Sequence, residues 1–288
     1  MDIPLYLIAL LASGALLIPS YDLFFKDRDN RRLAAYTSLT LLLISIVVVI
    51  VPYILPSVGL TSSTSLFRTD FLGIFFSVAV LLVTTLVVMS SIDYQRDDPN
   101  ATVYYSLLLF TALGMVLLAF AVDLLMIFVA WQLMSIPTFI LTGFRKKDSK
   151  SNEAAVKFFI LGALSSGILL YGISIVYGLV GSTNLNDVVI GFGKIIHSSP
   201  ELQPLAILSI VAMIAGFGLK MAIVPFHMWL PDALEGAPTP VSALLSAGTK
   251  KAGFVAAIRV FVIAMPLAFR LDIAITIAIL AIVTMTLG

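Results

Sequence analysis

Long runs of apolar residues, each followed by a short polar loop, repeat along the whole chain. Nine runs can be marked, at 3–25, 33–55, 69–92, 103–121, 123–144, 153–180, 205–228, 240–265 and 270–288. Each is close to the roughly 20 residues that a helix needs to cross a bilayer. The pattern therefore predicts an all-α polytopic membrane protein with about nine transmembrane helices. The longest loop, 181–204, is too short for a soluble domain.

Composition agrees with this prediction and excludes several classes of site. The chain is 60% hydrophobic and 11% charged, whereas soluble domains are about 25% charged. A net charge of +1 gives no reason to expect nucleic acid binding. The absence of cysteine excludes disulfides, thiolate catalysis and thiolate-held iron–sulfur or zinc sites in this chain. The apolar start has no basic region before it, so we expect a retained helix rather than a cleaved signal peptide.

Basic residues in the loops predict the orientation, because Lys and Arg near helix ends stay on the cytoplasmic side. One set of alternating loops holds nine of them: Lys26, Arg28, Arg31, Arg32, Arg96, Arg145, Lys146, Lys147 and Lys150. The intervening loops hold only Arg68, Lys194 and Arg270. We therefore expect the N-terminus to face the outside.

The seventh run contains a charge followed by a helix-breaking residue. Lys220 lies inside the apolar segment, and Pro225 follows it. A charge at membrane depth is costly and usually faces protein, water or a partner. Because proline lacks the N–H and crowds the preceding turn, we expect an interruption between about Lys220 and Phe226, lined by a polar cavity. The alternative is a snorkelling lysine at an ordinary helix end.

Five basic residues stand at helix positions: Lys157, Lys220, Lys250, Lys251 and Arg259. Lys250 lies ten residues past Pro240, roughly 15 Å into the membrane at 1.5 Å per residue. No Asp or Glu lies in the middle of any run. Buried lysines without a carboxylate can exchange protons, so such a row favours a proton relay. Arg259 keeps its charge, and we expect it to be an anchor or a charge tuner.

Further polar residues accompany this row. Glu153 and Lys157 share a helix face and can pair, although an ordinary helix-end ion pair would look the same. Gln132 lies about 14 Å past Asp123, where contact between helices is favoured over proton transfer. His227, in the interrupted stretch, carries an imidazole that suits proton exchange or only an interfacial hydrogen bond.

Three stretches carry a resemblance to a known family: VDLLMIFVAWQLMSIPTFIL (122–141), SNEAAVKFFILGALSSGILLYG (151–172) and GFGLKMAIVPFHMWLPDALEGAPTPVSALLSAGTKKAGF (216–254). They resemble the subunit N family of NADH-quinone oxidoreductase, an antiporter-like membrane subunit family of respiratory complex I and its archaeal relatives. The run PFHMWLPDALEGAPTPVSALL is also similar to Mrp-type antiporter and membrane-bound hydrogenase subunits. The resemblance is specific over runs four to eight and weak towards both ends.

The resemblance implies inverted five-helix repeats, each with a discontinuous helix, around a central line of lysines. Runs four to eight would form one five-helix antiporter-like repeat (103–265) with a discontinuous seventh helix. It follows three N-terminal helices (1–102) and precedes the start of a further helix (266–288). The family's broken-helix lysine falls on Lys220, its next-helix lysine on Lys250 and its EAA-x-K lysine on Lys157. Lys251 is an additional basic residue.

Two departures from the family pattern bear on function. The family's fifth-helix glutamate, which pairs with the broken-helix lysine, falls on Gln132. The chain also ends inside the ninth run, without the second repeat and its lysine. We therefore expect a fragment, a split gene product, or a half that works with a separate partner chain.

The resemblance implies a proton-translocating subunit of a complex I-type quinone oxidoreductase, with no redox chemistry in this chain. No phosphate loop, metal spacing or nucleophile–base pair is visible, so we expect no cofactor here and quinone and redox centres in partner subunits. The expected surroundings are a prokaryotic cytoplasmic membrane, its lipid and other membrane subunits, without nucleic acid. An Mrp-type or stand-alone cation/proton antiporter and a non-pumping scaffold are the alternatives.

Overall fold

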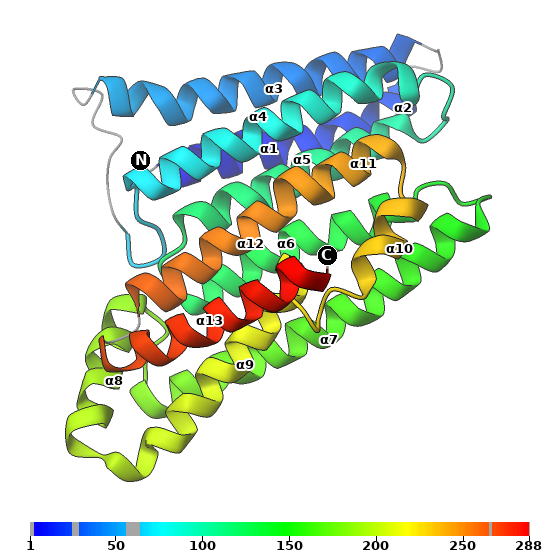
Figure 1. Ribbon diagram of the computed structural model, residues 1–288. Helices are drawn as coiled ribbons and strands as arrows, with labels where there is room; N and C mark the ends of the chain where they lie inside the picture. The colour runs from blue at the N-terminus through cyan, green and yellow to red at the C-terminus, as the bar shows by residue number, and fades with distance from the viewer. Residues whose placement is uncertain (1–2, 25–28, 56–63, 265–266, 288) are drawn as a thin grey trace.

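The computed structural model describes residues 3–24, 29–55, 64–264 and 267–287, which fold into a bundle of helices (Figure 1). By length and composition, seven helical segments can cross a membrane. They contain α1 (Ile3–Leu17), α3 (Asp29–Ile54), α4 (Phe71–Tyr94), α5 (Ala101–Phe120), α6 (Leu124–Thr142), α7 (Ser149–Val180) and α9 (Gln203–Met221). The predicted all-α membrane protein is confirmed, and the described residues include no β-strand.

The eighth and ninth predicted runs are helical as well, but the eighth is not a regular α-helix. Residues 239–263 form one continuous run in which α-helical pieces alternate with π-helical turns. These pieces are α11 (Thr239–Leu244), η4 (Leu245–Thr249), α12 (Lys250–Ala257) and η5 (Ile258–Ile263). The ninth run corresponds to α13 (Leu267–Leu287). Because π-helical turns frequently mark functional sites, the position of η4 directly before Lys250 is notable.

The loops fall alternately at the two ends of the bundle. At one end, Val122 N donates to Leu66 O at 2.9 Å, and Leu185 N donates to Val122 O at 3.0 Å. These bonds tie together the segments that follow α3, α5 and α7. At the other end, Arg31 Nη1 donates to the carbonyl of Arg96 at 3.2 Å. The alternation agrees with the predicted topology, and the choice of cytoplasmic end stays a prediction.

The centre of the bundle is α5, whose residues are almost all buried and which packs against α1, α4 and α6 (Figure 1). Gly114 allows a close approach of α5 to α6, since a Cβ at this position would lie 2.4 Å from the backbone nitrogen of Met134. Small residues permit such backbone contact between membrane helices. Packing around α5 therefore fixes where α6 presents its polar residues.

One predicted loop proves to contain a helix. Within residues 181–204, helix α8 (Leu185–Ser198) is followed by the short turn η3 (Pro200–Leu202). Its buried face consists of Leu185, Val188, Phe192 and Ile195, which recur at helical spacing. The helix is too short to cross a bilayer, so it adds no further membrane-spanning helix to those predicted from the sequence.

Candidate functional site

The predicted interruption of the seventh run is confirmed. Helix α9 ends at Met221, and Ala222 adopts the left-handed conformation with φ of 56°. Helical structure resumes only at α10 (Trp229–Gly236). The peptide bond before Pro225 is cis. The interruption covers the stretch that Pro225 predicted, because a ring without an N–H cannot continue the hydrogen-bond ladder.

Two side chains bind backbone groups at the interruption. The indole Nε1–H of Trp229 donates to the carbonyl of Leu219 at 2.7 Å, and so joins α10 to the last turn of α9. Val224 N donates to Thr284 Oγ1 of α13 at 3.1 Å. Trp229 also stacks on Phe158 of α7, with ring centroids 4.3 Å apart. The break is therefore a built feature of the fold, since freed backbone groups are tolerated at membrane depth where protein groups bind them.

Lys220 lies in the last turn of α9 and is only 3% exposed. Its Nζ donates to Thr138 Oγ1 of α6 over 3.4 Å, a long hydrogen bond. The same amine lies 5.4 Å from the ring centroid of Phe139 and 4.8 Å from that of Phe158. No carboxylate of the described residues lies within ion-pair distance of it. Lys220 is thus a buried amine between two aromatic faces, which favour a cation weakly.

Gln132 does not bind Lys220. Its Oε1 accepts a hydrogen bond from Ser166 Oγ of α7 at 2.7 Å. This bond joins α6 to α7, as expected for a polar contact between helices. Where the resemblance predicts a glutamate, this chain has a neutral amide whose oxygen already has a partner.

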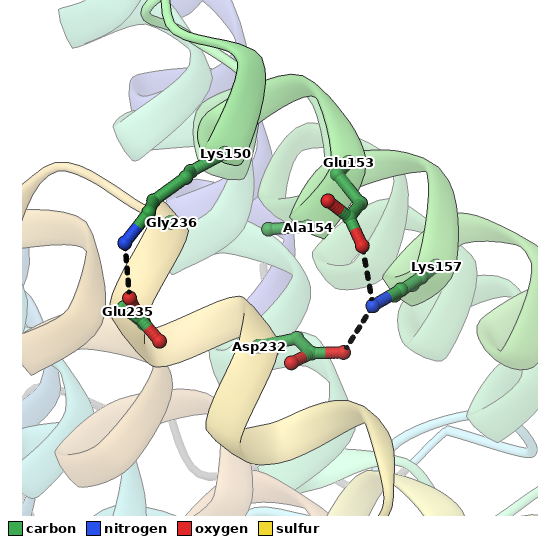
Figure 2. Close-up of a pocket in the computed structure, with 7 residues that line it drawn as sticks. All are labelled: Lys150, Glu153, Ala154, Lys157, Asp232, Glu235 and Gly236. Carbon is green, nitrogen blue, oxygen red and sulfur yellow. Dashed lines mark hydrogen bonds and ion pairs between the residues drawn. The ribbon is translucent and has the colours of Figure 1, made fainter.

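Lys157 stands in a different environment, at the end of the bundle where α7 and α10 meet. Its Nζ lies 2.7 Å from Glu153 Oε1 and 2.8 Å from Asp232 Oδ2, and its side chain is 45% exposed. Lys150 pairs with Glu235 at 2.8 Å (Figure 2). These side chains line a pocket of about 140 Å³. The predicted pairing of Glu153 with Lys157 is present, whereas Asp232 could not be foreseen from spacing along one helix.

Lys250 and Lys251 differ in their surroundings. Lys250 is half-buried at the junction of η4 and α12, and among the described residues it makes no ion pair. Lys251 is exposed, with Nζ 5.8 Å from the ring centroid of Phe254. One turn beyond Lys250, Gly253 brings α12 against Met221, so the helices that carry Lys220 and Lys250 touch beside the break.

His227 lies inside the interruption, between α9 and α10. Its Nδ1 is buried and has no hydrogen-bond partner among the described residues. Within those residues there is also no group of three or more His, Asp or Glu side chains that could hold a metal ion. Of the predicted site residues, Glu153 and Lys157 therefore lie together in one polar cluster, whereas Lys220 is buried apart from them, and in the described part of the chain Gln132, Lys250 and His227 are not hydrogen-bonded to its amine.

Sequence reasoning missed a buried ion pair. Arg259 of η5 is 1% exposed, and it donates from Nη1 and Nη2 to the two carboxylate oxygens of Asp70 at 3.0 and 2.7 Å. Its Nε donates to the carbonyl of Ala119 at 2.8 Å. Asp70 also caps α4 by accepting from Gly73 N at 2.8 Å. The position of Asp70 before an apolar run signals a helix cap, but no local pattern could identify its distant partner. Arg259 is therefore an anchor, which was one of its two predicted roles.

Comparison with known proteins relates this geometry to a family. The family described as NADH:quinone oxidoreductase/Mrp antiporter, TM, matches residues 121–288, more than half of the chain. NADH-quinone oxidoreductase subunit N of Heliobacterium modesticaldum is 40% identical over 285 residues, which are 98% of this chain and 57% of that protein. F(420)H(2) dehydrogenase subunit N of Methanosarcina mazei is 43% identical over 235 residues, which are 81% of this chain and 46% of that protein.

Solved structures give the same result for the fold. A chain of respiratory complex I from Thermus thermophilus superposes with a TM-score of 0.72 at 28% identity, covering 88% of this chain and 53% of that one. A chain of an archaeal membrane-bound sulfane sulfur reductase superposes with a TM-score of 0.70 at 20% identity, which shows a shared fold alone; it covers 89% of this chain and 52% of the other. The chain spans about half the length of the curated relatives it matches. By sequence and by fold, it belongs to the NADH:quinone oxidoreductase/Mrp antiporter transmembrane family.

Proposed function

We propose that this chain is a proton-translocating, antiporter-like membrane subunit of a complex I-type quinone oxidoreductase in a prokaryotic cytoplasmic membrane. The observation that carries the proposal is Lys220, a buried amine at the end of an interrupted helix with no carboxylate of the described residues beside it. Charged groups at membrane depth usually mark ion or proton pathways. The printed names of the relatives, subunits of quinone oxidoreductase and F(420)H(2) dehydrogenase, support the same class of assembly.

In this proposal the electrons travel through partner subunits, and the chain itself moves only protons. The open pocket between α7 and α10 gives water access to Glu153 and Asp232, whose carboxylates take up a proton. The proton passes by way of His227, whose Nδ1 is unpartnered, to the amine of Lys220. From Lys220 the proton continues to Lys250. Lys250 belongs to α12, the helix that touches α9 beside the break. Each step returns the donor to its earlier protonation state, and the relay is ready for the next proton once Lys250 has released its proton towards the opposite side of the membrane.

Gln132 supports a second candidate function. Because its side chain is a neutral amide, it supplies no negative charge to an ammonium at Lys220, and its oxygen already accepts from Ser166. A carboxylate at close range would stabilise that ammonium by a few kcal/mol at an effective dielectric near 20. If Lys220 lacks this stabilisation and stays neutral, the chain is a scaffold that completes a membrane assembly and translocates no proton. The family match covers Mrp antiporters as well, so exchange of a cation for a proton without redox partners is the remaining alternative.

The test is proton translocation by the purified natural assembly reconstituted in vesicles, with electron transfer measured in parallel. Lys220→Ala should lower the number of protons moved per electron, and Gln132→Glu should change it, because a carboxylate would then be available to the amine. Lys194→Ala, an exposed lysine on α8, is the matched control and should leave the ratio unchanged. If neither Lys220→Ala nor Gln132→Glu changes the ratio, the scaffold function is correct and the relay is refuted.

A further inference from the structure

A second pocket lies at the basic end of the bundle, away from the interrupted helix. It has a volume of about 200 Å³ and is formed where α3 begins and α4 ends, against α5. Three arginines line it, Arg31, Arg32 and Arg96, together with one carboxylate, Asp97. The charged lining therefore sums to three positive charges and one negative charge, a net charge of +2.

These arginines are not neutralised within the described part of the chain. Among the side chains that the structure describes, no carboxylate lies within 4.0 Å of any of the three guanidinium groups. Arg31 donates to the carbonyl of Arg96 at 3.2 Å, a bond that holds both residues at the pocket without cancelling charge. Arginine has five donors in a planar fork, which suits the oxygens of a phosphate group.

The two neighbouring pockets at this end show the contrast. The pocket around Lys157 holds its cations in ion pairs with carboxylates (Figure 2). A larger pocket, which shares Gln95 and Asp97 with the arginine pocket, is lined by Arg145, Lys146 and Lys147, but also by Asp97, Asp98 and Asp148, so its charges sum to zero. Among these three pockets, an excess of positive charge occurs only at the arginine pocket.

Apolar surface continues from the arginine pocket along both helices. On α3, Tyr36 lies four residues after Arg32 and is 55% exposed. On α4, Met89 lies three residues before the pocket-lining Ile92 and is 54% exposed. Residues three or four apart share one face of a helix. Tyr36 and Met89 therefore lie on the same helix faces as the residues that line the pocket, about one turn further along each helix. Since α3 packs against α4, an acyl chain could lie along this surface.

We propose that the arginine pocket binds the phosphate group of an anionic membrane lipid, with the acyl chains against α3 and α4. Basic pockets between membrane helices are known to bind acidic lipid headgroups. A free phosphate ion would satisfy the arginines equally well, but it would leave the adjoining apolar surface unused. The lipid is therefore the ligand that matches both parts of the surface.

The test uses the natural assembly, stripped of lipid and placed in nanodiscs, with bound lipid measured by native mass spectrometry. Phosphatidylglycerol should be retained in preference to phosphatidylcholine. The double variant Arg32→Gln/Arg96→Gln should weaken this retention by about 30-fold, because each basic residue near the surface contributes about 1 kcal/mol. Asp97→Asn should strengthen it several-fold, which keeps the test decisive if the arginine variants fail to assemble. Lys146→Gln/Lys147→Gln is the matched control and should weaken retention much less than the arginine variant does, because these two lysines do not line the arginine pocket.

Several outcomes would overturn the inference. Equal retention of phosphatidylcholine would mean that the headgroup charge is not recognised. Displacement of phosphatidylglycerol by inorganic phosphate at comparable concentration would mean that the pocket takes the ion and not the lipid. An equal loss in the Lys146→Gln/Lys147→Gln control would mean that the attraction is spread over the whole basic end.

Discussion

The buried pair of Asp70 and Arg259 allows a sharp test of what holds the eighth helical run in place. Arg259 is bound by both oxygens of Asp70 and by the carbonyl of Ala119. Asp70→Asn removes the negative charge and keeps the shape. The asparagine oxygen can still accept from Gly73 N, because asparagine caps helices about as well as aspartate. The change therefore isolates the ion pair from the cap.

The expected cost follows from the burial of the two side chains. The side chain of Arg259 is 2% exposed and that of Asp70 is 28% exposed. Removing one partner of a buried ion pair costs about 3–5 kcal/mol, since the other charge is left without compensation. Water can reach Asp70 and replace part of the lost interaction, so we expect the lower end, about 3 kcal/mol. This corresponds to a change on the order of 100-fold in a local opening equilibrium.

Hydrogen exchange of the assembled protein, read by mass spectrometry, measures this directly. Peptides that contain the first turn of α4 and the η5 turn should exchange on the order of 100-fold faster in Asp70→Asn. The matched control is Asp123→Asn. Asp123 caps α6 by accepting from Leu125 N and Met126 N, accepts a further hydrogen bond from Thr183 Oγ1, and pairs with no cation among the described residues. In this control, hydrogen exchange in the first turn of α6 should become faster by less than about tenfold. If the two variants accelerate exchange equally, the ion pair adds nothing beyond the cap and the reasoning is refuted.

Three further predictions concern packing, the helix break and topology. Gly114→Ala should prevent assembly of the subunit, since its Cβ would meet the backbone of α6, whereas Gly167→Ala, with no atom within 4 Å, should leave assembly and thermal stability intact. Trp229→Phe should lower the free energy of unfolding by at least about 1 kcal/mol, because the hydrogen bond to α9 is lost and the smaller phenyl ring leaves part of the buried indole site empty; an unchanged midpoint in a thermal unfolding assay would argue against that bond. Lys147→Cys and Lys194→Cys should label from opposite membrane faces with an impermeant thiol reagent, and labelling from the same face would contradict the topology.

The sequence could predict those features whose cause lies within a few residues along the chain. The membrane helices were predicted from apolar runs of the right length, because a helix that crosses a bilayer must be long enough and hydrophobic enough. Pro225 located the interruption for the same local reason. The pairing of Glu153 with Lys157 followed from the four-residue spacing on one helix. Helix α8 was missed because it is short, although the spacing of Leu185, Val188, Phe192 and Ile195 was a usable signal.

The partners of buried polar groups could not be predicted in this way. Ser166 lies on a different helix from Gln132, and Asp70 is 189 residues from Arg259. The local sequence pattern does not indicate which of several polar residues is the partner, because this depends on which helix faces pack together and on how far along each helix the two residues lie. Those meetings are set by close packing, for example at Gly114, where α5 and α6 approach.

The sequence by itself therefore determined the membrane class, the helical runs, the break and the candidate lysines. Only the tertiary structure decided which lysines are buried. Lys220 is enclosed by Phe139 and Phe158 of two other helices, whereas Lys157 lies between carboxylates at the end of the bundle. The physical reason is that hydrophobicity and helix breaking act locally, while burial and ion pairing depend on residues that only folding brings together.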